Sequence, residues 1–205
     1  MVWGTRLRGS ALAEQGYVEE GIEQMQQGMS ALQAMGTEAA RAIYLADLAA
    51  AYAKVERVAE GLDLLVEALA RVEKTDGRVW EAELYRLKGE LTLQQLKIKN
   101  AKLKITETQD PTASFQGAEV CFLKAIEIAR RQQAKSLELR ATMSLARLWQ
   151  QQGKQHKAHN MLSGGYSWFT EGFDTKDLQE AKALLEDLGR KAKRGNGETD
   201  ERKTS

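Results

Sequence analysis

The two histidines, His156 and His159, are the residues whose type and spacing come closest to forming a metal site. On a helix, positions i and i+3 share one face, so both imidazoles could bind one zinc ion. Zinc needs one or two further ligands nearby, and no Cys, Asp or Glu lies between Glu138 and Glu171. The pattern favours an exposed helix edge, and we predict neither a metal nor a cofactor.

Other catalytic patterns are also missing from the sequence. It has no Gly-rich loop followed by Lys-Ser or Lys-Thr, and Ser163 lacks the glycine two residues earlier that a nucleophile elbow requires. Cys121 precedes Phe122 on the face of an expected helix, which indicates a packed thiol rather than a reactive one. We therefore predict a protein without catalytic residues.

The composition is that of a helical protein. The 205 residues contain 30 basic and 29 acidic side chains but only one proline and one cysteine. A single proline allows long uninterrupted helices, and a single cysteine cannot form an internal disulfide. No window approaches the roughly 18 consecutive apolar residues of a membrane span, and the N-terminus lacks the apolar segment of a signal peptide. We expect a cytoplasmic, all-α protein that does not enter a membrane.

Excess positive charge is concentrated in residues 97–108 and 189–205. A nucleic-acid surface places its Lys and Arg side chains on a rigid face, whereas order is least expected in these two segments. The charge distribution therefore argues against nucleic acid as a partner.

A repeated pattern organises the chain: a small residue, a large one four positions on, and a small one three further. It recurs at spacings of 40, 57 and 40 residues. The four occurrences are Gly21, Met25 and Gly28; Gly61, Leu65 and Ala68; Ala118, Phe122 and Ala125; and Ala158, Leu162 and Gly165. Upstream of each lies a second marker: Gly9 with Leu12, Ala49 with Tyr52, Gly89 with Thr92, and Ala146 with Trp149. Spacings of three and four put these residues on one helix face, where small side chains let two antiparallel helices pack closely.

This pattern resembles the tetratricopeptide repeat (TPR), whose helix pair shows W-x2-L-G-x2-Y and then A-x3-F-x2-A. The resemblance implies an all-α, TPR-like, right-handed solenoid of helical hairpins, with four repeats and a C-terminal capping helix. The period here exceeds the ~34 residues of that family, so longer helices are expected, and HEAT-like repeats of ~40 to 47 residues stay a structural alternative. The predicted repeats cover about residues 1–36, 37–75, 78–134 and 135–170.

Three further segments complete the predicted domain of residues 1–188. Residues 97–114 are expected to form a polar loop inserted in the third repeat, with a short hairpin or a partner-docking segment as alternatives. Residues 174–188 are expected to form the capping helix, and 189–205 a disordered tail. The apolar side chains near Met1 lead us to expect a fragment of a longer protein. The tryptophans, Trp3, Trp80, Trp149 and Trp168, are expected at helix crossings in the core.

Three longer stretches resemble a narrower family. They run over 80–91, over 118–140 and over 168–175. Similar stretches occur in the C-terminal repeat region of large bacterial regulators that combine an adenylate or guanylate cyclase-like domain, a P-loop ATPase domain and a helical repeat array. The resemblance covers roughly residues 3–188 and implies a sensing or assembly region without catalytic residues.

In a TPR solenoid the first helix of each pair lines a concave groove. The candidate partner-binding residues on these helices are Arg6, Ser10, Ile43, Ala46, Ala50, Arg86, Glu90, Arg140, Met143, Arg147 and Gln150. No Asn lies at these places, which argues against the carboxylate grip of co-chaperones. Our hypothesis is a protein-interaction scaffold that binds protein or peptide segments, including ATPase or cyclase domains upstream in the same polypeptide. The alternative is a free-standing TPR adaptor that binds a peptide in its groove.

Overall fold

The computed structural model describes residues 2–34, 40–75, 77–102 and 111–201, and the described residues contain helices but no strand. The chain forms two compact units, Met1–Cys121 and Phe122–Ser205, and the boundary between them falls within a helix. The single domain of residues 1–188 and its repeat boundaries therefore remain predictions.

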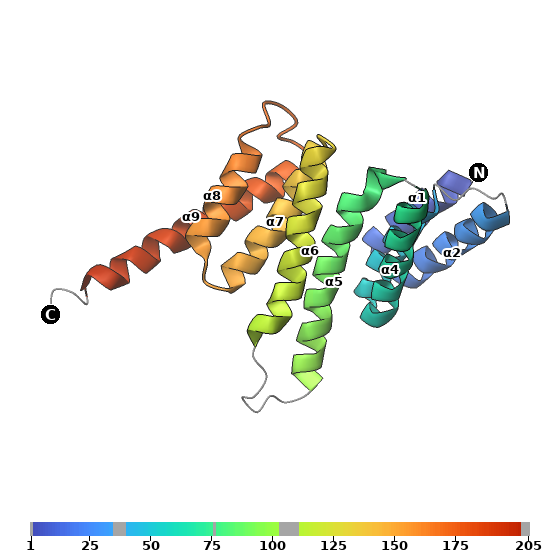
Figure 1. Cartoon of the computed structure of the whole chain (residues 1–205), viewed down its shortest axis with the longest axis horizontal. Coiled ribbons are helices and arrows are strands. Elements are labelled where there is room, and N and C mark those ends of the chain that lie inside the picture. Colours follow the sequence, from blue (N-terminus) through green and yellow to red (C-terminus); the bar gives the residue numbers. More distant parts are fainter. Residues whose placement is uncertain (1, 35–39, 76, 103–110, 202–205) are drawn as a thin grey trace. The chain divides into compact units, whose positions relative to one another are not determined.

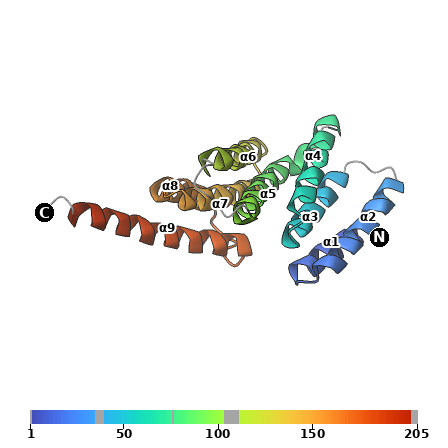
Figure 2. The same cartoon turned by 90° about the horizontal axis from the view of Figure 1, so that it is seen from below.

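The first unit is a series of helical hairpins. It contains α1 (Val2–Glu14), α2 (Val18–Ala34), α3 (Arg41–Lys54), α4 (Val58–Thr75), a short 3-10 helix (Arg78–Trp80), α5 (Glu81–Lys102) and the first half of α6 (Pro111–Arg131). Helix α1 packs on α2 (Figure 1), and α3 packs on α4 (Figure 2); α3 also contacts α1 and α5. Helix α3 is thus a neighbour of both α1 and α5.

The second unit contains the rest of α6, α7 (Lys135–Gln151), α8 (Gln155–Tyr166) and α9 (Lys176–Glu201). Helices α7 and α8 pair, and α9 contacts both of them. Figure 2 shows α9 continuing beyond the α7–α8 pair toward the C-terminus.

The same tight turn ends four of the helices. The backbone N–H of Tyr17 donates to the Leu12 carbonyl at 2.9 Å, and Arg57, Ala134 and Lys154 make the equivalent bond to the residue five positions earlier. The residue before each donor has a positive φ; these residues are Gly16, Glu56, Gln133 and Gly153. This is a Schellman ending, in which the left-handed residue usually is glycine. The glycine-free turn after α3 therefore has the same geometry as the turns that contain glycine.

Small residues set the spacing of the helices in the α1–α2 and α3–α4 pairs. A Cβ added to Gly21 would lie 2.5 Å from the Gly9 carbonyl oxygen, and one on Gly9 would lie 2.7 Å from the Gly21 carbonyl oxygen. At Gly61 an added Cβ would lie 2.7 Å from Leu91 and 3.0 Å from the Ala49 carbonyl oxygen. The predicted close approach at these markers is confirmed. It is wrong at Gly165, where the nearest such atom is 4.0 Å away.

The large residue of each repeat marker lies in the core. Met25, Leu65, Phe122 and Leu162 have no exposed surface. Leu65 belongs to a cluster formed by α3, α4 and α5, together with Leu45, Leu84 and Leu91. Burial of these side chains supplies most of the free energy that holds the hairpins together.

Two expected irregular segments are helical where the structure describes them. The loop predicted over 97–114 is wrong for 97–102, which continue α5, and for 111–114, which begin α6; residues 103–110 lie outside the described residues. The disordered tail predicted over 189–205 is wrong up to Glu201, because α9 continues to that residue, and 202–205 lie outside the described range. Pro111 does not interrupt a helix, because it occupies the first helical position of α6, where proline is favoured.

Three of the four tryptophans are not in the core. Trp149 is 3% exposed, but Trp3, Trp80 and Trp168 are 55%, 36% and 57% exposed. These three lie at the beginning or the end of a helix or in a loop, where fewer neighbours cover them. The prediction of core tryptophans holds for Trp149 alone.

Candidate interaction surface

Five of the eleven predicted site residues are partly exposed on the first helices of the first unit. Arg6 and Ser10 lie on α1, Ala50 on α3, and Arg86 and Glu90 on α5. We call these five residues the inner-helix strip. Because α3 contacts both α1 and α5, the strip crosses three neighbouring helices.

The charges of the strip are held in internal ion pairs. Arg6 donates through Nη1 to Asp47 Oδ2 on α3, at 2.5 Å. Arg86 donates to Glu83 Oε1 at 2.7 Å and to Glu90 Oε1 at 2.5 Å. Both arginine side chains are only about 15% exposed, so their positions are constrained before any partner binds.

The pKa values follow from this packing. Burial raises the pKa of Asp47, and the Glu83 carboxylate adds to that effect, while Arg6 opposes it. Burial acts to lower the pKa of Arg86, but the carboxylates of Glu83 and Glu90 outweigh it and the pKa is raised. Arg86 therefore stays cationic.

The buried Nε of Arg6 has no hydrogen-bond partner among the described residues. Asp47 was not among the residues predicted from the sequence. It lies 41 residues after Arg6, which is close to the repeat period of 40, and this spacing could have indicated that the two residues occupy equivalent positions on neighbouring first helices.

Three predicted groove residues are core residues instead. Ile43, Ala46 and Met143 are 5%, 2% and 3% exposed. Ile43 packs with Leu32 and Tyr44. Helices α3 and α7 are covered by neighbours on more than one side, so residues next to the packing markers are buried as well.

The predicted groove residues of the fourth repeat contact α9. Arg140 donates to Asp177 at 2.6 Å, Arg147 to Glu180 at 2.9 Å and Gln150 to Asp187 at 2.7 Å. The acidic side chains of α9 thus face the basic side chains of α7. These three side chains are in contact with α9, while those of Arg140 and Arg147 remain 44% and 42% exposed. The groove of the fourth repeat stays a prediction.

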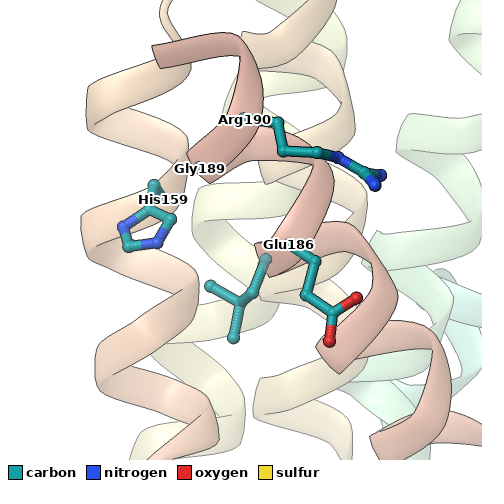
Figure 3. Close-up of a pocket in the computed structure, with 5 residues that line it drawn as sticks. His159, Glu186, Gly189 and Arg190 are labelled. Carbon is teal, nitrogen blue, oxygen red and sulfur yellow. The ribbon is translucent and has the colours of Figure 1, made fainter. Parts of the chain in front are cut away.

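A shallow cavity of about 550 Å³ lies between α8 and α9. Figure 3 shows His159 on α8 across from α9, with the side chain of Arg190 directed away from the imidazole. Leu185 and Gly189 supply the apolar part of the wall. No group of three or more His, Cys, Asp or Glu side chains suited to a metal ion occurs among the residues that the structure describes.

Cys121 is half-buried on α6. Burial raises the pKa of its thiol, and the nearby Lys88 ammonium opposes that effect. A thiol whose pKa is raised is a weaker nucleophile at neutral pH, because less of it is thiolate.

No described helix combines the length and the apolar character needed to cross a membrane.

Comparison with known proteins relates the chain to others by its fold. No protein-family model and no curated protein matches the sequence. The structure is similar to the nearly identical TPR-like repeats assigned to a kinesin light chain of Podosopora anserina, with a TM-score of 0.65 and 16% identity over 97% of this chain and 90% of that one. A single-substitution variant of those repeats matches with a TM-score of 0.66 and 14% identity, at the same coverages.

The apo form of RapI is also similar, with a TM-score of 0.65 and 14% identity over 95% of this chain and 50% of RapI. The chain thus spans half the length of RapI. These likenesses show the fold: the chain is an all-α, TPR-like helical repeat.

Proposed function

We propose that this protein is a non-catalytic interaction scaffold that binds protein or peptide segments along the inner-helix strip. The observation that carries the proposal is the strip itself. Two constrained ion-pair groups flank the small side chains of Ser10 and Ala50 on three neighbouring helices. Small side chains leave room for a partner, and charges already held in place lose little conformational entropy when a partner binds.

The proposed setting is the C-terminal sensing or assembly region of a bacterial, cytoplasmic cyclase–ATPase regulator. The support is the sequence resemblance over 80–91, 118–140 and 168–175. In that setting the partners include the ATPase and cyclase domains of the same polypeptide. The alternative is a free-standing TPR adaptor, which would use the same strip for a peptide from another protein.

The gene distinguishes the two settings. The nucleotide sequence upstream of the Met1 codon, read in frame, either continues into a P-loop ATPase module or reaches a stop codon. Continuation supports the regulator. A stop codon, with no ATPase–cyclase gene beside it, contradicts the regulator and leaves the adaptor.

A pair of matched variants tests the strip. Ala50→Arg places a long cation on α3 within the strip, whereas Ala70→Arg makes the same change on the exposed side of α4. Binding of the purified ATPase–cyclase module, or of the captured partner in the adaptor setting, is measured by calorimetry. We expect Ala50→Arg to weaken binding by about tenfold or more, as at the centre of an interface, and Ala70→Arg to leave it unchanged. Equal affinities of both variants and the unsubstituted chain would contradict the strip.

A further inference from the structure

A second cavity, separate from the inner-helix strip, lies within the second unit. Its volume is about 320 Å³, and its walls come from the C-terminal end of α6, the N-terminal part of α7, the C-terminal half of α8 and the residue Trp168 beyond it. This size lies at the lower end of the range of roughly 300–1,000 Å³ typical of ligand pockets. The α8–α9 cavity of Figure 3 supports a ligand site less well. It lies next to the part of α9 beyond residue 191, whose side chains are not described.

Two cations are held at the cavity wall by one buried carboxylate. Glu138 is 6% exposed; its Oε1 accepts a hydrogen bond from Arg130 Nε at 2.6 Å and its Oε2 one from Lys135 Nζ at 2.8 Å. Burial acts to raise the pKa of Glu138, but these bonds outweigh it and the pKa is lowered, so the carboxylate is ionised at neutral pH. One negative and two positive charges leave the wall with a net positive charge.

The positive charges remain accessible although they are fixed. The side chains of Arg130 and Lys135 are 60% and 33% exposed. The Lys135 ammonium also lies 5.5 Å from the centre of the Trp168 ring, which adds a cation–π contact to its bond with Glu138. Such a group can accept an anion without first being ordered, and this lowers the entropy cost of binding.

An exposed aromatic surface adjoins the charges. Trp168 is 57% exposed, and its ring packs edge-on against Phe169, with 5.1 Å between ring centres. Met161 adds a flexible apolar wall. Tryptophan is enriched at the energetic centres of protein interfaces.

Two glycines line the cavity at positions where the backbone does not require glycine. Gly164 and Gly165 lie in the last turn of α8, and neither has a positive φ. A Cβ at Gly164 would meet nothing within 4 Å, and one at Gly165 only a Thr142 methyl at 4.0 Å. Alanine would favour the helix by up to about 1 kcal/mol at each position. Neither backbone geometry nor helix packing explains these glycines, but an occupant of the cavity would.

The geometry points to a second binding site, in which this cavity receives the side-chain carboxylate of an acidic peptide segment from a partner protein. The carboxylate lies against Arg130 and Lys135, and an apolar neighbour of the acidic residue packs on Trp168 and Met161. The net positive wall selects an anion, and the apolar surface beside it selects a peptide over an inorganic ion.

The test uses the full 205-residue chain and an array of short random peptides. The peptides are acetylated and amidated, so that every carboxylate on them is a side chain. We expect the bound peptides to be enriched in Asp or Glu next to aliphatic or aromatic residues. The strongest binder is then titrated by fluorescence anisotropy. Lys135→Gln should reduce the preference for acidic peptides.

Gly164→Leu is the decisive variant, because Gly164 lines the cavity and an added Cβ there meets nothing within 4 Å. His156→Leu is its matched control, an added leucine on the exposed face of the same helix. We expect Gly164→Leu to weaken binding of the strongest binder by about tenfold or more and His156→Leu to leave it unchanged. Neither variant should melt below the unsubstituted chain, because leucine favours a helix over glycine.

Three outcomes would overturn the site: Gly164→Leu binding as the unsubstituted chain does, bound peptides without an acidic preference, or no peptide bound at all. Loss of binding in Ala50→Arg but not in Gly164→Leu would place the peptides on the inner-helix strip, and this too would overturn the cavity site.

Discussion

The contact between α1 and α2 makes a sharp prediction about Gly21. In an ordinary helix, replacing glycine by alanine stabilises the fold by about 1 kcal/mol. At Gly21, however, the new Cβ would lie 2.5 Å from the Gly9 carbonyl oxygen and 2.9 Å from the Ala13 backbone nitrogen. Both are backbone atoms, which cannot rotate away as the end of a flexible side chain could.

Relief of this overlap requires the two helices to separate by several tenths of an ångström. Overpacking of this kind costs typically 1–3 kcal/mol, and the rigidity of both neighbours places Gly21→Ala in the upper part of that range. After the gain in helix propensity, we expect a net loss of about 1–2 kcal/mol in the free energy of unfolding.

Gly4→Ala is the control, because it lies in α1 of the same unit and an added Cβ there meets nothing within 4 Å. Urea unfolding followed by circular dichroism at the helix band measures both variants. Gly4→Ala should be neutral or stabilising, and Gly21→Ala destabilising. If the two variants had equal stabilities, the close approach of α1 and α2 would be refuted.

Three other predictions concern single side chains. Leu65→Ala leaves a cavity at a fully buried position in the α3–α4–α5 cluster and should lower the free energy of unfolding by about 2–5 kcal/mol. If urea unfolding showed a decrease of less than about 1 kcal/mol, the packing around Leu65 would be contradicted. Glu56→Gly removes a side chain from a left-handed residue with φ of 60° and should stabilise the chain by up to about 1 kcal/mol, raising its melting temperature. The pKa of Glu138 is lower in the folded chain than in the unfolded chain. Its ionised carboxylate therefore stabilises the fold at pH values above the unfolded pKa, and this stabilisation is lost as the pH falls through the folded pKa. The unsubstituted chain should therefore lose more stability on acidification from neutral pH than Glu138→Gln does, and parallel pH profiles would argue against the ion pairs of Glu138.

The helical hairpins were predictable from local patterns. The recurring small and large residues, such as Gly21 with Met25, have spacings that only a helix places on one face. The structure buries Met25 and brings Gly9 against Gly21, as the pattern predicted. The Schellman turns were predictable where glycine marks them, at Gly16 and Gly153, but the same turn at Glu56 carries no glycine signal.

Helix ends were harder to predict. The only proline and a polar run suggested a loop over 97–114, and the lack of apolar residues larger than alanine suggested disorder after 189. Helices α5 and α9 nevertheless continue into these segments. Lys, Arg, Ala and Glu are good helix formers, and a helix that is already nucleated extends through them at little cost. A polar sequence therefore does not by itself indicate where a helix stops.

The sequence by itself determined that the chain forms helices and, for α1–α2 and α3–α4, the residues at which the two helices pack, because these depend on spacing within one or two turns. Only the tertiary structure decided which polar side chains are paired with another part of the chain. Arg140 and Arg147 had the pattern of groove residues, but Asp177 and Glu180 of α9 pair with them. Likewise, Gly165 had the pattern of a packing residue, but it lines a cavity. A helix's own sequence indicates which face is apolar, whereas the neighbours that cover its other faces come from distant parts of the chain.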